Sequence, residues 1–150
     1  MDIDVAELKR GLSSSQQYLL SHHESHEWYR CYAIPVFGRT VRICARCLGV
    51  YLGIAAGILT YGLLPAWVPT LVVVAVLPLP ALVDWYLTTF FDRRGYNGVR
   101  TLTGGLLGYA YGLGLLVLVV GFDWRVVVVG LAYGIAAAIL LGHKPHPEPS

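Results

Sequence analysis

The dominant feature of the chain is a run of apolar residues that begins near residue 47 and continues to residue 142. Polar residues do not recur within it at the spacing expected for a helix or strand that is half exposed to water. The run is interrupted only by the charged side chains of Asp84, Asp92, Arg93, Arg94, Arg100, Asp123 and Arg125. This pattern predicts helices that are apolar on every side, as in a membrane.

The length of the run accommodates four membrane-spanning helices. Crossing roughly 30 Å of hydrocarbon takes about 20 helical residues, within a range of about 17 to 25. Connections at residues 62–69 and 122–125 are so short that they make their flanking helices antiparallel neighbours. The expected spans cover residues 47–67, 68–90, 101–122 and 126–142.

We therefore predict an all-α fold, a polytopic membrane protein with a bundle of about four transmembrane helices at residues 47–142. Residues 1–46 form a polar, partly helical segment that carries the cysteines and histidines, and residues 143–150 form a proline-rich tail.

Composition and charge support this assignment. Mean hydropathy is +0.60 and 13% of the residues are charged, against about 25% in an average soluble domain. The net charge of +2 is too small to indicate a nucleic-acid partner. Of the eleven Lys and Arg residues, all except Arg125 lie on one side of the four-span arrangement. The positive-inside rule then predicts a multi-pass protein of the cell membrane with both termini in the cytoplasm.

Small residues recur at every fourth position in three of the expected spans. Such stripes let helices approach closely in lipid, so they predict packing within the bundle first and a homo-oligomer or another membrane protein as a further partner. The stripes comprise Gly49, Gly53 and Gly57; Gly104, Gly108 and Gly112; and Gly130, Gly134, Ala138 and Gly142.

The second span carries Pro78 and Pro80, which remove two backbone donors and disfavour a straight helix. A break of this kind is tolerated in a membrane where protein or water satisfies the freed carbonyls. It marks either a cavity or a simple kink, and the kink is the more ordinary expectation.

Potential metal ligands are concentrated just before the first span. Cys44 and Cys47 have the Cys-x-x-Cys spacing that lets two thiolates meet one tetrahedral zinc ion or a similar divalent ion. Cys31 is a candidate third ligand, and His22, His23 and His26 are candidates for the remaining position. A Cys3His or Cys2His2 site would fix the polar segment to the bundle.

Two other interpretations of the same cysteines stay open. A Cys-x-x-Cys pair near a helix amino terminus, with Arg42 and Arg46 close by, favours thiolate and therefore thiol exchange. Alternatively, these are ordinary buried thiols beside surface histidines, since no complete zinc-finger spacing is present.

A second group of polar residues lies between the second and third spans. Arg93 and Arg94 there are explained by the positive-inside rule and by contact with anionic lipid. If this group faces the metal site, the candidate catalytic residues are Asp84, Asp92, Asn97 and Arg100. The two aspartates would then transfer protons, while Asn97 and Arg100 would hold a phosphate or another anionic headgroup.

The sequence C-A-R-C-L-G-V-Y-L-G at residues 44–53 resembles the signature of a family of small predicted membrane proteins, domain of unknown function 2085. The segment around Pro80 to Trp85 and the later Asn97 and Arg100 resemble the second motif region of this family. Many members carry a Cys-His pair upstream, where this chain has Ser21-His22. If the family site is a metal centre, the resemblance implies that Cys31 or His23 replaces that cysteine.

The resulting hypothesis is a small membrane metalloprotein, in its strongest form an enzyme acting on an amphiphilic or phosphorylated substrate. The alternatives are a non-enzymatic scaffold or accessory subunit with a structural metal site, and a thiol redox relay or transporter.

Overall fold

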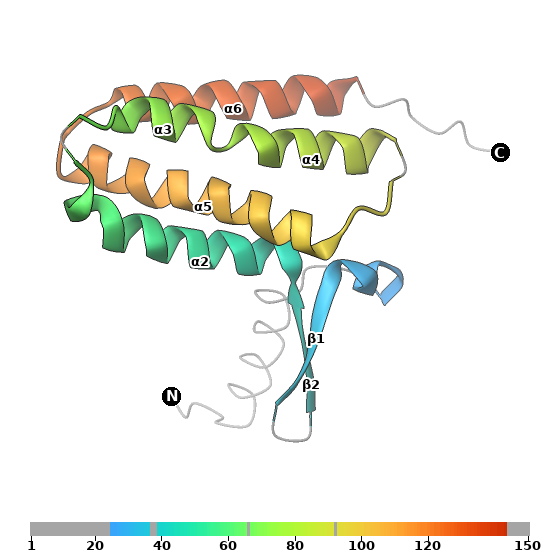
Figure 1. The fold of residues 1–150 in the computed structure, drawn as a ribbon. Helices are drawn as coiled ribbons and strands as arrows, with labels where there is room; N and C mark the ends of the chain where they lie inside the picture. Colours follow the sequence, from blue (N-terminus) through green and yellow to red (C-terminus); the bar gives the residue numbers. More distant parts are fainter. Residues whose placement is uncertain (1–24, 37–38, 66, 92, 144–150) are drawn as a thin grey trace, which may run out of the picture.

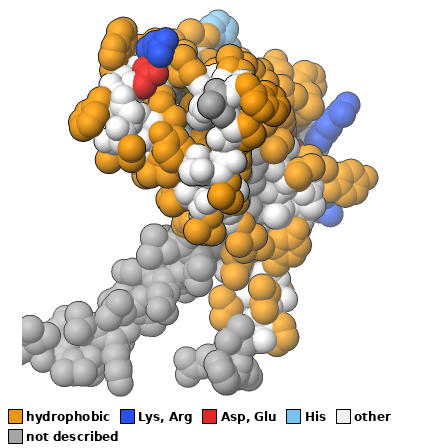
Figure 2. Space-filling model, turned by 60° about the vertical axis from the view of Figure 1, so that its left-hand side comes forward, with side chains coloured by type: hydrophobic (Ala, Val, Ile, Leu, Met, Phe, Trp, Pro, Cys, Tyr) orange, Lys and Arg blue, Asp and Glu red, His pale blue; other side chains and the backbone are white. Residues whose placement is uncertain are grey.

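In the computed structural model, residues 25–36, 39–65, 67–91 and 93–143 are described, with only the backbone at residues 25, 26, 36 and 39. Within these residues, four helical segments are long and apolar enough to cross a membrane: Ala45–Leu63, Thr70–Phe90, Asn97–Val119 and Arg125–Gly142. The predicted helical membrane bundle is therefore confirmed, with boundaries shifted by up to four residues. Many large apolar side chains of the helices are exposed, and they are prominent on the face drawn in Figure 2, as contact with lipid allows.

The helices run up and down in sequence order (Figure 1). Helix α2 (Ala45–Thr60) is followed by a short 3-10 turn, then by α3 (Thr70–Val76) and α4 (Leu79–Phe90). Helices α5 (Asn97–Val119) and α6 (Arg125–Gly142) complete the bundle. The start of α2, the end of α4, the start of α5 and the end of α6 share one end of the bundle, which we call the hairpin end. Both short connections make their flanking helices antiparallel, but among the described residues only α5 and α6 also pack side by side as expected, whereas α2 packs chiefly against α5 and not against α3 (Figure 1).

Helices α2 and α5 are interlocked through their glycines. A Cβ added at Gly57 would lie 2.5 Å from the carbonyl oxygen of Tyr109, and one added at Gly112 would lie 2.5 Å from that of Ile54. Each helix thus places its small residues against the backbone of the other, which is the close approach that dispersion forces reward in lipid. Two of the three predicted stripes pack as expected.

The glycines of α6 do not pack in this way. A Cβ added at Gly130, Gly134 or Gly142 would meet nothing within 4 Å among the described residues. The expectation that the fourth span uses its stripe for packing within the bundle was therefore wrong. Because α6 contributes no residue that is fully buried, it forms the loosely attached edge of the bundle.

The second span is broken between α3 and α4, as Pro78 and Pro80 predicted. The Pro78 carbonyl accepts hydrogen bonds from the backbone N–H groups of Ala81 and Leu82, both at 3.1 Å. The hydroxyl of Tyr133, on α6, donates to the carbonyl of Ala75 in the last turn of α3. Protein groups therefore satisfy carbonyls at the break, and Pro78 also borders a cavity, so the break is both a kink and a cavity wall.

A two-stranded antiparallel hairpin precedes the bundle, where the sequence had predicted only partly helical structure. Its strands are β1 (Cys31–Val36) and β2 (Arg39–Cys44), and β2 leads directly into α2. A 3-10 helix at Ser25–Arg30 precedes β1, and its Trp28 ring lies under the Arg42 guanidinium at 3.7 Å. Three of the six residues of β2 are β-branched (Thr40, Val41 and Ile43), which favours a strand. The hairpin projects from the hairpin end of the bundle (Figure 1).

Candidate functional site

The base of the hairpin brings the three cysteines together. Cys31 opposes Cys44 in the strand register, because the two residues occupy the first β1 position and the last β2 position. Cys47 follows in the first turn of α2, and its thiol lies within hydrogen-bonding range of Cys44 and electrostatic range of Cys31. Cys44 is 3% exposed, and no disulfide joins the three cysteines. The three cysteines thus all lie at the base of the hairpin.

The thiols supply suitable donor atoms for a soft metal ion but not a complete site. Within the described part of the chain, no three His, Cys, Asp or Glu side chains form a group that could hold a metal. His22 and His23 and the side chain of His26 lie outside the described residues. A metal site at the hairpin base therefore requires the thiols to converge and a further ligand to join them.

Asp84 forms an ion pair with Arg46. The Arg46 guanidinium donates through Nη2 to Asp84 Oδ2, joining the start of α2 to the middle of α4. The Asp84 side chain is 9% exposed. An ionisable side chain at this depth is costly unless it is paired, so the ion pair accounts for Asp84 without any substrate. The Nε–H of Arg46 is buried and has no acceptor among the described residues.

Arg100 holds the loop between α4 and α5 in place. It is 3% exposed, and it donates to the carbonyl of Arg94 and, at 3.3 Å, to Oδ1 of Asn97. Asn97 in turn donates through Nδ2 to the carbonyl of Tyr29 at 2.9 Å. This chain of contacts connects the segment before β1 to the start of α5.

Glycine is required at the centre of that loop. Gly95 has a φ of +63°, and an added Cβ would lie 2.9 Å from Cγ2 of Thr88 and 3.1 Å from Nη2 of Arg100. The left-handed backbone and the close guanidinium both exclude a larger residue. The backbone of the loop therefore packs closely against the Arg100 side chain.

The hairpin end carries an excess of positive charge. Arg30 and Arg46 lie within electrostatic range of Arg100, as does Asp84. Arg30 is also paired with Glu27 at 3.2 Å. Three arginines therefore face two carboxylates, and the guanidinium groups of Arg30 and Arg94 each lie 5.4 Å from the Tyr29 ring centroid. Such a cluster attracts anions to this end of the bundle.

A sequence model of a family described as predicted membrane protein, DUF2085, matches residues 29–114 of this chain. The match covers more than half of the chain and includes the hairpin, the first two spans, most of the third, and the three cysteines, Asp84, Asn97 and Arg100. The chain belongs to the DUF2085 family. The resemblance read from the sequence is therefore confirmed, together with the membrane class that the family description states.

The chain is also similar to uncharacterized protein MJ1492 of Methanocaldococcus jannaschii, with 26% identity over 88 residues. The matched stretch covers 53% of this chain and 56% of the relative, so this DUF2085 protein spans about half the length of the curated relative it matches. No solved structure matches the chain.

Of the predicted site residues, the structure brings together the three cysteines in one group and Asn97 and Arg100 in another. Asp84 lies within electrostatic range of Arg100 but bonds to Arg46, and Asp92 lies outside the described residues. The sequence reading missed the contributions of Tyr29 and Thr101. Thr101 donates to the Ala45 carbonyl at 3.1 Å and lies 3.1 Å from the Tyr32 hydroxyl.

These missed contacts link segments far apart in the chain. The pairing of Thr101 with Tyr32, for example, spans 69 positions. The polar Thr101 near the start of an apolar helix indicated that its hydroxyl needs a hydrogen-bond partner. The sequence alone did not show which residue that partner is.

Proposed function

We propose that this DUF2085 protein is a membrane metalloprotein whose hairpin-base thiols bind a zinc-type divalent ion at the membrane surface. The observation that carries the proposal is the grouping of Cys31, Cys44 and Cys47. Thiolates are the preferred ligands of structural zinc, and a Cys3His set needs one additional imidazole. His22, His23 and His26 are the candidate donors, since they immediately precede this group in the chain.

The role that fits the surroundings best is structural. Asp84, Asn97 and Arg100 each bond to protein groups, and these bonds tie α2 to α4 and the segment before β1 to α5. A metal ion at the hairpin base would add a third link to these two, because its ligands would come from both the hairpin and the start of α2. Four protein ligands would saturate such an ion, as in structural zinc sites. The protein would then present a rigid, metal-locked hairpin to a membrane partner.

If the protein is instead a metalloenzyme, the metal ion and the residues around it must meet different requirements. A catalytic ion keeps an open coordination position, and Arg100 or Asn97 would have to exchange a present partner for a substrate headgroup. Only three protein ligands would then be used. Ligand count therefore separates the structural form from the catalytic one.

A second candidate function is thiol redox exchange, favoured by the contact between Cys44 and Cys47. Two thiols in contact at Cys-x-x-Cys spacing can form a reversible disulfide when an oxidised thiol partner accepts the two electrons and two protons. Cys31, opposite Cys44, would serve as an alternative disulfide partner. This function predicts a disulfide after mild oxidation instead of bound metal.

A cobalt titration tests the proposal. Co²⁺ bound by thiolates gives a charge-transfer absorption band, whereas cobalt bound through nitrogen and oxygen alone does not. The full chain should show this band, and Cys44→Ser and Cys31→Ser should each reduce it. A Cys47→Ser variant with an unchanged band would exclude Cys47 from the site, and no band in the full chain would overturn the proposal. Tetrahedral cobalt without a bound water would indicate the structural form.

A further inference from the structure

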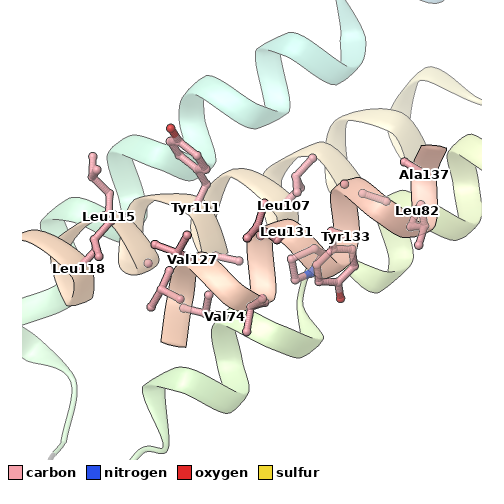
Figure 3. A pocket seen from close by; sticks show the side chains of 18 of the residues that line it. Val74, Leu82, Leu107, Tyr111, Leu115, Leu118, Val127, Leu131, Tyr133 and Ala137 are labelled. Atoms are coloured by element: carbon pink, nitrogen blue, oxygen red, sulfur yellow. The ribbon is translucent and has the colours of Figure 1, made fainter. Parts of the chain in front are cut away.

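The transmembrane bundle contains a large apolar cavity between α3–α4, α5 and α6, with a volume of about 720 Å³. Side chains from all four of these helices surround it, among them Val74, Leu107, Leu118 and Tyr133 (Figure 3). Its lining is almost wholly hydrocarbon and aromatic carbon. No cysteine is among its lining residues, and neither metal binding nor thiol exchange explains it.

The cavity extends along α5. Its α5 wall runs from Leu107 to Leu118, eleven residue steps, which at 1.5 Å each gives about 16 Å. This length is close to one leaflet of a hydrocarbon core about 30 Å thick. The apolar lining and this length together suit a hydrocarbon chain of the bilayer.

One end of the cavity is charged. Arg46 belongs to the lining, and its backbone lies beside Gly104, one turn before Leu107 on α5. Its Nη2 is bonded to Asp84, but its buried Nε–H has no acceptor among the described residues. Arg30 and Arg100 add to the positive field around it. The Arg46 side chain is nevertheless 25% exposed, and a guanidinium group binds phosphate oxygens through charge-assisted hydrogen bonds.

We infer that this cavity is a binding site for one anionic phospholipid of the bilayer. Its hydrocarbon chain lies between α5 and α6, and the phosphate of its headgroup lies against the Arg46 guanidinium group. The absence of fully buried residues in α6 follows from this arrangement, because the lipid chain supplies contacts that a helix would otherwise make. The open space beside Gly130 and Gly134 is part of the space for the chain.

The inference can be tested by filling the cavity. Gly134 lines it, and an added Cβ there meets nothing within 4 Å among the described residues, so Gly134→Leu places a side chain in the lipid space without striking the backbone. Gly142→Leu is the matched control, because Gly142 lies on the same helix with the same open surroundings and outside the lining. Both changes replace a helical glycine with a good helix former.

The protein is reconstituted in bilayer discs of mixed phosphatidylcholine and phosphatidylglycerol, re-extracted gently and examined by native mass spectrometry. We expect the unchanged chain and Gly142→Leu to retain phosphatidylglycerol, and Gly134→Leu to lose it. Equal retention by the two leucine variants would overturn the inference. It would also be overturned if Gly134→Leu altered a dimer population and left lipid retention unchanged, since a second copy would then occupy the α6 face.

The headgroup contact is tested separately at Arg46. Arg46→Lys keeps a positive charge beside Asp84 but removes the planar guanidinium group that binds phosphate, and Arg46→Gln removes the charge as well. We expect both variants to lose the preference for phosphatidylglycerol over phosphatidylcholine, with Arg46→Lys available should Arg46→Gln not fold. An unchanged preference in the folded variants would refute the assigned headgroup contact. A Cys44→Ser/Cys47→Ser variant should retain the lipid, which separates this site from the metal proposal.

Discussion

Arg46 and Asp84 form an ion pair that joins the first turn of α2 to the middle of α4. The two charges lie at the end of an otherwise apolar bundle, where each is stable because the other is present. The charge of the same arginine acts on the neighbouring Cys47 thiol. Arg46 also lines the apolar cavity. One residue of the signature thus connects the thiols, the second span and the proposed lipid site.

Breaking this pair should weaken the bundle. Asp84→Asn leaves the Arg46 charge without its carboxylate in a place where the Asp84 side chain is 9% exposed. We expect a loss of about 1 to 3 kcal/mol in the free energy of unfolding, because removing one partner of a buried pair leaves the other charge unpaired. Reversible unfolding in mixed detergent micelles measures it, and a double-mutant cycle with Arg46→Gln isolates the pair.

The ion pair between Asp123 and Arg125 provides the control. It lies in the α5–α6 connection with Arg125 65% exposed, so Asp123→Asn should change stability very little. Hydrogen bonds from Arg125 hold the pKa of Asp123 below its ordinary value. The small contribution of this pair is therefore present above the ordinary aspartate pKa and disappears as the pH falls through the lowered value. Equal losses from Asp84→Asn and Asp123→Asn would contradict the assigned burial of Asp84.

The contact between α2 and α5 should not tolerate even one methyl group. A Cβ at Gly108 would overlap the backbone of Val50, so Gly108→Ala must push the two helices apart. We expect a destabilisation of about 1 to 3 kcal/mol, typical of overpacking, measured by thermal unfolding in detergent. Gly142→Ala, with open surroundings, should be neutral or slightly stabilising. Similar melting temperatures for the two variants would refute the interlocked contact.

The attachment of α6 depends on a small number of polar contacts, of which Tyr133 makes one. Tyr133→Phe removes the hydrogen bond to the Ala75 carbonyl at the helix break. We expect a loss of about 1 kcal/mol and faster hydrogen exchange at the end of α3. Tyr111→Phe, at a side chain that is 62% exposed, should have a smaller effect. Unchanged exchange at the end of α3 would show that the break is satisfied without Tyr133.

The helices were predictable because each span has about the length needed to cross the hydrocarbon core and is apolar on all sides, and neither property depends on tertiary contacts. The break at Pro78 was predictable for a similarly local reason, the missing N–H of proline. The hairpin was not predicted, since its strands are short and lie in a segment read for ligands and not for β-branched residues. The packing of the α6 glycines was predicted wrongly, because a stripe specifies small residues but not which helix they meet.

The site was predictable only in part for the same physical reason. Cys44 and Cys47 are neighbours in the chain, so their spacing alone brings them together. The opposition of Cys31 and Cys44 depends on the hairpin register, and the pairing of Arg46 with Asp84 depends on how α2 and α4 pack. Asn97 and Arg100 were grouped in the loop before the third span, but both lie in the first turn of α5, three residues apart, where Arg100 donates to Asn97.

Metal removal should expose the thiols. If Cys31, Cys44 and Cys47 hold an ion, a thiol reagent should modify them slowly in the metal-bound protein and at least several-fold faster after treatment with a chelator, because bound thiolates must leave the metal to react. Cys44, 3% exposed, should remain the slowest of the three. Mass spectrometry of the labelled protein assigns each site. Rates unaffected by the chelator would argue for thiols that bind no ion.

The most direct test of the central claim is the metal content of the detergent-purified full chain, measured by elemental mass spectrometry beside a Cys44→Ser/Cys47→Ser variant. The variant's helical content, measured by circular dichroism, establishes that it has folded. The metal-site account predicts about one zinc-type ion per chain and its loss in the folded variant. Equal metal content in the two proteins, or none in either, would contradict it.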